Sequence, residues 1–271
     1  YSAKAGLECV VLVPAGKIAM GKLSQALIHG AKVLAVNGGF DDCLKLVKEL
    51  SKNERFYLLN SINPFRLEGQ KTAAFEIYEQ LGGAVPDKLF IPIGNAGNIV
   101  AYWKGFKELK HLGLIDELPS FMGVQAMGAS PIYKAFIQGL NTIEPMESVE
   151  TMATAIRIGR PVNWKRALRA IRETDGRVGA VTDEEILNAQ RILASKEGVF
   201  AEPAGASPIA FLIKAAREGF IEKDSRVVCI VTGHGLKDPD IVLKHAAELI
   251  EVEAEVESIL RALGVEKAEA V

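Results

Sequence analysis

The sequence predicts an α/β protein with open, mostly parallel twisted sheets and helices on both faces. Short runs rich in valine, isoleucine and leucine recur along the 271 residues, and segments with helical periodicity separate them. Continuous apolar runs bounded by turn residues are typical of strands that are covered on both faces of a sheet. Regular alternation of such strands with helices indicates right-handed crossovers, which place helices on both sides.

Seven apolar runs are predicted to be strands. They are residues 9–13 (CVVLV), 32–36 (KVLAV), 56–59 (FYLL), 88–93 (KLFIPI), 121–126 (FMGVQA), 178–181 (VGAV) and 227–231 (VVCIV). Between the first two runs, Leu23, Ala26 and Leu27 recur at helical spacing, which predicts an amphipathic helix. The acidic amphipathic stretch 246–263 is predicted to form a helical tail.

The spacing of strands and helices predicts two lobes. The rhythm is regular up to about Phe65 and then resumes with longer intervals. We therefore expect residues 1–65 to be the remainder of a small lobe. Residues 66–271 would form a large lobe with the helical tail.

Composition favours a small-molecule site. Hydrophobic residues make up 49% of the chain, and the net charge of -2 comes from interspersed signs, which favours neither nucleic acid nor an anionic membrane surface. No apolar run is long enough to cross a bilayer. Cys9, Cys43 and Cys229 are far apart in apolar runs, which indicates free thiols and a cytoplasmic location. The four histidines lack metal-ligand spacing, so we expect no metal.

The loop after the fourth apolar run, in PIGNAGNI, is predicted to bind an anion. Gly94 and Gly97 allow backbone conformations that turn amide groups inward, and the following helix would add its positive end. Asn95 and Asn98 could cap that helix or donate side-chain amides. The loop lacks a nucleotide-binding pattern, so a phosphate monoester is the favoured ligand. For these residues alone, a capped turn without a ligand fits equally well.

A second candidate anion site follows the FYLL run. Asn63 and Pro64 form a good helix start, with asparagine as the cap and proline in the first turn. Arg66 lies in that first turn, where a cation opposes the helix dipole, so we expect it to meet an anion. The alternative is a surface salt bridge to Glu68 or a neighbouring residue.

Two further strand or helix ends carry polar side chains. Thr232 follows the last apolar run, where its hydroxyl could bond a ligand or cap the strand. Glu202 precedes Pro203, which is also consistent with an ordinary helix start. His234 lies between glycines and is predicted to be structural.

Taken together, these stretches resemble the threonine synthases, which are pyridoxal-phosphate enzymes of fold type II, the group related to the tryptophan synthase β-subunit. The matching sequence segments occur in the same order as in the family and cover nearly the whole chain. They are VLVPAGKIAMGKLSQALIHGA, NSINPFRLEGQKT, PIGNAGNI, GVQAMGASP, TMATAIRIG, AVTDEEIL, FAEPAGA and TGHGLKDPD.

The resemblance implies a cofactor, a substrate and roles for individual residues. The implied activity converts O-phospho-L-homoserine and water to L-threonine and phosphate by elimination and hydration, in a family whose members usually form homodimers. Thr232 would contact the pyridine nitrogen, where a neutral hydroxyl stabilises a protonated ring less than a carboxylate does. The cofactor-phosphate loop would be Gly94, Asn95, Ala96, Gly97 and Asn98, and the substrate phosphate would be held by Asn60, Ser61, Arg66 and Asn95.

The sequence departs from the family in one important respect. The family's cofactor-binding lysine belongs to a Ser-Phe-Lys-Asp-Arg-type motif that occurs nowhere here, and neither Lys17 nor Lys22 matches it. We therefore expect this chain to be a portion of a longer protein, and to hold the cofactor poorly and catalyse nothing alone. Arg160 is a smaller departure, since asparagine is expected there.

Two other functions remain open. One is another fold type II enzyme, a threonine or serine dehydratase or a cysteine synthase. The other is a non-catalytic protein that binds a phosphate-bearing ligand.

Overall fold

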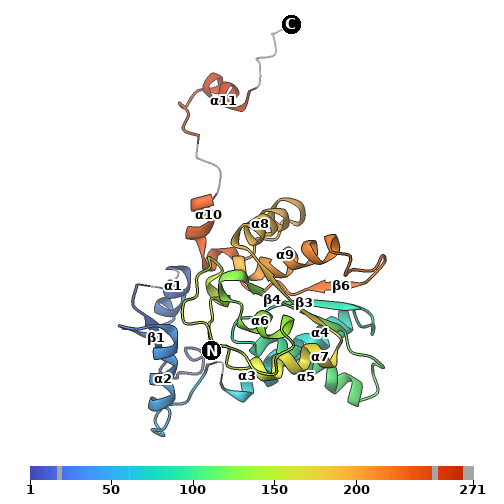
Figure 1. Ribbon diagram of the computed structural model, residues 1–271. Helices are drawn as coiled ribbons and strands as arrows, with labels where there is room; N and C mark the ends of the chain where they lie inside the picture. The colour runs from blue at the N-terminus through green and yellow to red at the C-terminus, as the bar shows by residue number, and fades with distance from the viewer. Residues whose placement is uncertain (17–19, 61, 246–249, 265–271) are drawn as a thin grey trace. The chain divides into compact units, whose positions relative to one another are not determined.

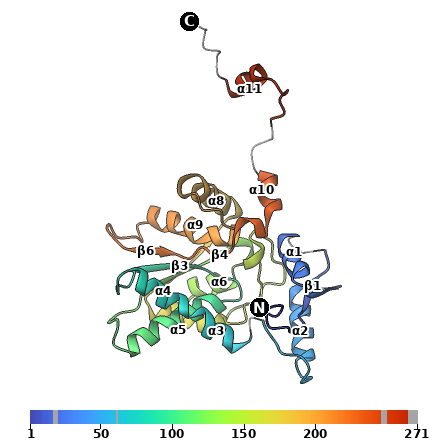
Figure 2. The same cartoon turned by 180° about the vertical axis from the view of Figure 1, so that it is seen from behind.

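The computed structural model describes residues 1–16, 20–60, 62–245 and 250–264. The chain divides into two compact units, Tyr1–Pro239 and Asp240–Val271. The first unit contains both sheets (Figures 1 and 2). None of the helices in the described part of the chain is long and apolar enough to cross a membrane.

A two-stranded parallel sheet lies near the start of the chain. Strand β1 (Val10–Pro14) pairs with β2 (Lys32–Val36) in the register Val10 to Lys32. Helix α1 (Met20–Ile28) connects the two strands, and α2 (Phe40–Leu50) follows and packs on β1. The predicted strands and helix in this region are therefore present.

The main sheet has four parallel strands in the order β5-β4-β3-β6. They are β3 (Lys88–Pro92), β4 (Ser120–Ala126), β5 (Arg177–Val181) and β6 (Val227–Cys229). Because all four run in one direction, their carboxyl ends meet at one edge, which is where open parallel sheets bind ligands.

Helices cover both faces of this sheet, as the two views show (Figures 1 and 2). On one face lie α4 (Thr72–Gln80), α5 (Gly97–His111), α7 (Trp164–Glu173) and α6 (Pro131–Ile137), with α3 (Pro64–Gln70) packed on α5. On the other face lie α8 (Asp183–Glu197) and α9 (Pro203–Arg217).

Three 3-10 turns and two more helices complete the described structure. The turns are η1 (Met127–Ala129), η2 (Thr154–Ile156) and η3 (Gly235–Lys237), and the helices are α10 (Pro239–His245) and α11 (Val256–Leu263).

Side-chain alternation along β3 divides the core into two layers. Leu89 and Ile91 pack with residues of α5 and α7, whereas Phe90 packs with residues of α8 and α9. Phe90 meets Phe211 of α9 edge-on, with ring centroids 5.3 Å apart. Successive side chains of a strand point to opposite faces, so a central strand needs apolar residues throughout. The predicted fold class, α/β with parallel sheets and helices, is confirmed.

Two predicted elements are wrong in detail. Residues 56–59 are not a strand, because their backbone bonds locally: the Phe56 amide donates to the Asn53 carbonyl, and the Leu58 carbonyl accepts from the Asn63 side chain. In the predicted tail helix, residues 246–249 lie outside the described residues, residues 250–255 are not helical, and α11 begins at Val256. The lobe boundary at residue 65 stays a prediction.

Candidate functional site

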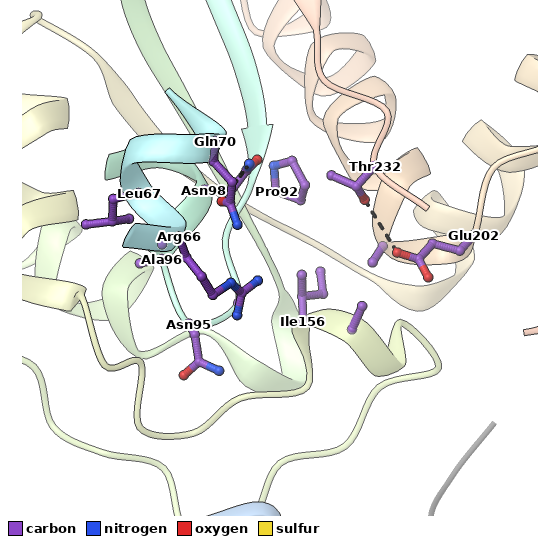
Figure 3. Close-up of a pocket in the computed structure, with 14 residues that line it drawn as sticks. Arg66, Leu67, Gln70, Pro92, Asn95, Ala96, Asn98, Ile156, Glu202 and Thr232 are labelled. Carbon is purple, nitrogen blue, oxygen red and sulfur yellow. Dashed lines mark hydrogen bonds between the residues drawn. The ribbon is translucent and has the colours of Figure 1, made fainter. Parts of the chain in front are cut away.

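A cavity of about 300 Å³ lies at the carboxyl ends of β3 and β6 (Figure 3). It combines residues from α3, the β3–α5 loop, η2, the start of α9 and the segment after β6. The lining residues are Arg66, Leu67, Gln70, Pro92, Gly94, Asn95, Ala96, Gly97, Asn98, Ala155, Ile156, Glu202, Ala204 and Thr232. The topology therefore brings the Gly94 loop, Arg66 and Thr232 together in one cavity.

The β3–α5 loop presents an uncapped helix start to this cavity. Helix α5 begins at Gly97, and its N-cap residue is Ala96, whose backbone is left-handed (φ 62°). No side chain caps this end, so of the two roles open to Asn95 and Asn98, capping the helix or donating side-chain amides, capping does not occur. The first amide groups of a helix have no acceptor within the helix. An uncapped helix start facing a cavity is suited to an anion.

The two glycines of this loop matter because they have no side chain, and not because their backbone is left-handed. The left-handed residue is Ala96, whereas Gly94 and Gly97 do not have positive φ. A Cβ atom at Gly94 would lie 2.9 Å from the Ala155 carbonyl oxygen, so glycine there allows the loop to approach η2 closely. At Gly97 the nearest atom to such a Cβ would be 3.7 Å away. Gly97 thus leaves the first turn of α5 open.

Asn95 and Asn98 occupy different environments. The Asn95 carbonyl accepts from the Asn163 amide (3.1 Å), which ties the loop to the segment before α7. The Asn98 side-chain nitrogen donates to Gln70 Oε1 (3.4 Å), but its Oδ1 is buried and has no hydrogen-bond partner among the described residues. A buried polar atom without a partner is costly in a folded protein, so Asn98 is a candidate for contact with a ligand.

Arg66 extends into the cavity from α3, toward Asn95 (Figure 3). Asn63 caps this helix by accepting from the Phe65 amide (2.9 Å), as predicted. The salt bridge to Glu68 that was the alternative for Arg66 does not form. Glu68 instead pairs with Lys71 and Lys104, and no carboxylate among the described residues pairs with Arg66.

The other two predicted substrate residues are not in this lining. Asn60 is half-buried, and its side-chain oxygen accepts from the Ile62 amide (3.0 Å) in a local turn. Ser61 lies outside the described residues. Arg160 is also away from the lining, on the surface, 3.6 Å from Glu147.

Thr232 lies opposite the Gly94 loop, beside a buried carboxylate. The Thr232 hydroxyl is 3.5 Å from Glu202 Oε1, and Glu202 is only 6% exposed (Figure 3). Lys22 Nζ, from α1, lies 3.7 Å from the other oxygen of Glu202. The Lys22 ammonium also donates to Thr154 Oγ1 (3.2 Å), and Thr154 Oγ1 donates to Asp238 Oδ2 (2.9 Å).

The sequence did not predict this Glu202 and Lys22 arrangement. The usable signal was Glu202 itself, a charged residue between an apolar run and Pro203. No local pattern pairs it with Lys22, which is distant in the chain. His234 is structural: its Nδ1 accepts from the Leu236 amide (3.1 Å), and its ring meets Phe200 edge-on.

The described part of the chain contains no group of three or more histidine, cysteine or acidic side chains that could hold a metal ion. None of the described lysines belongs to the lining. The site is therefore built from backbone amides, amide side chains, one guanidinium, one hydroxyl and one carboxylate.

Known proteins resemble this chain over nearly its whole length. A family model described as "Pyridoxal-phosphate dependent enzyme" matches residues 1–233. The chain is 57% identical over 263 residues to threonine synthase of Methanocaldococcus jannaschii, covering 97% of this chain and 65% of that protein. It is 50% identical over 265 residues to threonine synthase of Mycobacterium tuberculosis, covering 97% of this chain and 71% of that protein.

The fold also matches a solved structure. The crystal structure of threonine synthase from Escherichia coli superposes with a TM-score of 0.71 at 25% identity, over 94% of this chain and 59% of that chain. The present chain thus spans less than two thirds of the length of the archaeal relative and of the solved structure.

Proposed function

We propose that this chain, which belongs to the family of pyridoxal-phosphate-dependent enzymes, is a portion of a threonine synthase. The reaction would convert O-phospho-L-homoserine and water to L-threonine and phosphate. Identity of 57% to one relative and 50% to another, each over 97% of the chain, supports this activity over that of other members.

The cavity fits the cofactor on three counts. The uncapped first turn of α5 suits a phosphate group. The Asn98 side-chain nitrogen, whose bond to Gln70 Oε1 is a long 3.4 Å, is a hydrogen-bond donor at the same helix start. The hydroxyl of Thr232 lies on the opposite side of the cavity, where it would meet the ring nitrogen. We therefore propose that Gly94, Asn95, Ala96, Gly97, Asn98 and Thr232 hold pyridoxal phosphate.

The observation that carries the proposed substrate is the guanidinium of Arg66 in this same cavity, which pairs with no carboxylate among the described residues. A cation without a carboxylate partner, next to an anion-binding helix start, gives the cavity two positions for phosphate groups. O-phospho-L-homoserine brings the second phosphate. We propose that Arg66 binds it together with Asn60, Ser61 and Asn95.

These positions give the cofactor and each of the proposed binding residues a separate role in the reaction. Bound pyridoxal phosphate supplies an electron sink for carbanion chemistry. The α5 start would fix the cofactor phosphate, and Thr232 would orient the ring. Arg66 would hold the phosphate of the substrate at the place where it leaves as an anion, which stabilises the charge that develops there.

The direct test uses the full-length protein, because no described lysine lines the cavity and the chain covers 65% of a relative. The protein, loaded with pyridoxal phosphate, is given O-phospho-L-homoserine, and both phosphate and L-threonine are measured. We expect equal amounts of the two products. A cofactor-loaded protein that releases neither would contradict the proposal.

The same preparation separates the alternatives. A dehydratase would form a 2-oxo acid from L-threonine or L-serine, and a cysteine synthase would consume O-acetyl-L-serine and sulfide. A non-catalytic binding protein would bind the cofactor or a phosphate ester and turn over none of these substrates. The substrates of the dehydratase and of the cysteine synthase carry no phosphate for Arg66 to bind.

The proposal also covers the cellular location and the oligomeric state. We infer a cytoplasmic location from the three free cysteines and a homodimer from the family resemblance. Light scattering of the full-length protein during size-exclusion chromatography would give the molar mass, and a monomer at micromolar concentration would contradict the dimer.

A further inference from the structure

We infer that Gln70 binds the cofactor phosphate: its side-chain oxygen accepts a hydrogen bond from Asn98, and its side-chain nitrogen donates to the phosphate at the start of α5. The inference rests on the proposed function, in which that helix start holds pyridoxal phosphate. It adds a donor from α3 to a phosphate site that otherwise consists of the β3–α5 loop.

Gln70 lies on the face of α3 that borders the cavity. It is the last residue of α3, about one helical turn after Arg66, and both residues belong to the lining. One turn of helix advances about 5.4 Å along the axis. Gln70 lies beside Asn98, whereas Arg66 extends toward Asn95 (Figure 3). The two α3 residues therefore face different parts of the cavity, and Gln70 is the one in contact with the first turn of α5.

Contacts between α3 and α5 fix the position of Gln70. A Cβ atom at Gly97 would lie 3.9 Å from Leu67 Cδ2, so Leu67 packs beside the first residue of α5. Lys71, the residue after Gln70, donates to Glu108 Oε1 of α5 (2.9 Å). Gln70 is thus held between an apolar contact on one side and an ion pair on the other.

The contact with Asn98 decides which atom Gln70 offers to a ligand. Asn98 Nδ2 donates to Gln70 Oε1 (3.4 Å), which is the one hydrogen bond of the Gln70 side chain among the described residues. A glutamine side chain carries an acceptor oxygen and a nitrogen with two protons. Because the oxygen is directed to Asn98, the nitrogen and its protons remain for a ligand. A free nitrogen donor fits an anion.

A phosphate monoester has several oxygens to satisfy, and one helix start does not reach all of them. The first amide groups of α5 point along the helix axis and approach a phosphate from one side. Gln70 belongs to a different helix and approaches from another side. A hydrogen bond to a charged group is stronger than one between neutral groups, so a single well-placed amide can change cofactor affinity measurably.

The test is a titration of the full-length protein, freed of cofactor, with pyridoxal phosphate, followed by absorbance. Gln70→Glu keeps the size of the side chain and an oxygen that accepts from Asn98, but it removes the nitrogen donor. A glutamine that served only to hold Asn98 would tolerate this change. We expect the Kd for pyridoxal phosphate to rise by at least about 10-fold, which corresponds to the loss of one hydrogen bond to a charged group.

Three controls make the result specific. Gln70→Met removes the donor without adding a charge and should also raise the Kd by about 10-fold. Pyridoxal, which lacks the phosphate, should bind the wild type and both variants equally. Gln80→Glu changes an exposed glutamine at the end of α4, outside the cavity lining, and should leave both Kd values unchanged.

Each outcome bears on the inference. An unchanged Kd for pyridoxal phosphate in folded Gln70→Glu would overturn it, as would an equal loss of affinity for pyridoxal, and Gln70→Met decides by the same criteria should Gln70→Glu fail to fold. Normal cofactor affinity with a raised KM for O-phospho-L-homoserine would assign Gln70 to the substrate phosphate and would also overturn it. If cofactor affinity falls as expected but the wild type forms no threonine, the proposed function fails and this inference stands. Failure of the wild type to bind pyridoxal phosphate would overturn both.

Discussion

Arg66 occupies a position from which its own helix gains nothing. A cation in the first turn of a helix opposes the helix dipole, at a cost of about 0.3–1 kcal/mol. Glu68, the carboxylate nearest in sequence, is already engaged by Lys104 and Lys71, and those hydrogen bonds hold its pKa below the usual value. The unfavourable charge is therefore left for a ligand, which is the physical basis of the proposed substrate site.

Replacing Arg66 separates substrate binding from cofactor binding. In full-length Arg66→Ala, we expect kcat/KM for O-phospho-L-homoserine to fall by at least about 100-fold, the loss of a charge-assisted bidentate contact. Cofactor absorbance should be almost unchanged. Arg66→Lys should recover only part of the activity, because lysine keeps the charge and lacks the planar fork.

A matched control is Arg217→Ala, in the last turn of α9, whose first residue Pro203 follows Glu202. It lies about 20 Å along the helix from the cavity and should leave kcat/KM unchanged. Loss of cofactor from Arg66→Ala would contradict the assignment of this residue to the substrate.

Cys229 shows how strand burial suppresses thiol chemistry. Burial in β6 raises the pKa of Cys229 to about 12 from 9.0. The thiolate is the reactive form, so Cys229 should resist iodoacetamide at pH 8 in the folded chain and react once urea unfolds it. Mass spectrometry of the alkylated peptides measures this, and rapid labelling of the folded chain would contradict it.

The same raised pKa links stability to alkaline pH. Above pH 9 the unfolded chain loses this proton while the folded chain keeps it up to about pH 12, so ionisation favours unfolding. The free energy of unfolding should therefore fall more steeply with pH in the wild type than in Cys229→Ala. Equal slopes between pH 9 and 11 would show that Cys229 stays accessible to ionisation in the folded state.

At the scale of elements, contact between α4 and α5 depends on a missing side chain. A Cβ atom at Gly105 of α5 would lie 2.5 Å from the Lys71 carbonyl oxygen and 2.7 Å from Ala74 Cβ. These atoms belong to backbone and to a fully buried alanine, so neither can move aside easily. The packing of α3 and α4 on α5, and with it the placement of Arg66, requires glycine here.

Two glycine-to-alanine changes test this packing against helix propensity. Gly105→Ala should lower the free energy of unfolding by about 1–3 kcal/mol, because overpacking outweighs the gain of up to about 1 kcal/mol from propensity. Gly69→Ala in α3, where a Cβ would meet nothing within 4 Å, should raise it by about 0.5–1 kcal/mol. Urea unfolding of the chain measures both, and a stabilising Gly105→Ala would show that the helices lie further apart.

Elements with strong local signals could be predicted, and those that depend on a neighbour could not. The strands of the main sheet could be predicted because they are apolar on both faces. The start of α3 could be predicted because Asn63 and Pro64 suffice to cap it. The FYLL run has the same composition as a strand, but a strand exists only where another strand pairs with it. The left-handed residue in the β3–α5 loop is Ala96 and not a flanking glycine, because Gly94 is fixed by its approach to η2.

At the scale of the whole molecule, the site depends on topology more than on any one loop. Parallel strands with their carboxyl ends together bring Thr232 opposite the Gly94 loop, and this could be predicted once the sheet was assigned. The contact of Glu202 with Lys22 could not, because it depends on α1 packing against η3. A Cβ atom at Gly21 would lie 2.3 Å from the Leu236 carbonyl oxygen, a proximity that no sequence period indicates.

The stability of the first unit should not depend on the end of the chain. Both core clusters lie within Tyr1–Pro239, and α11 in the second unit has no buried residue. Helical segments without buried apolar surface contribute little to global unfolding. Removing residues 246–271 should therefore change the melting temperature of the remaining chain by less than about 2 °C, which differential scanning calorimetry measures. A drop of more than about 5 °C would instead mean that these residues stabilise the first unit by about 2 kcal/mol or more, and that they unfold cooperatively with it.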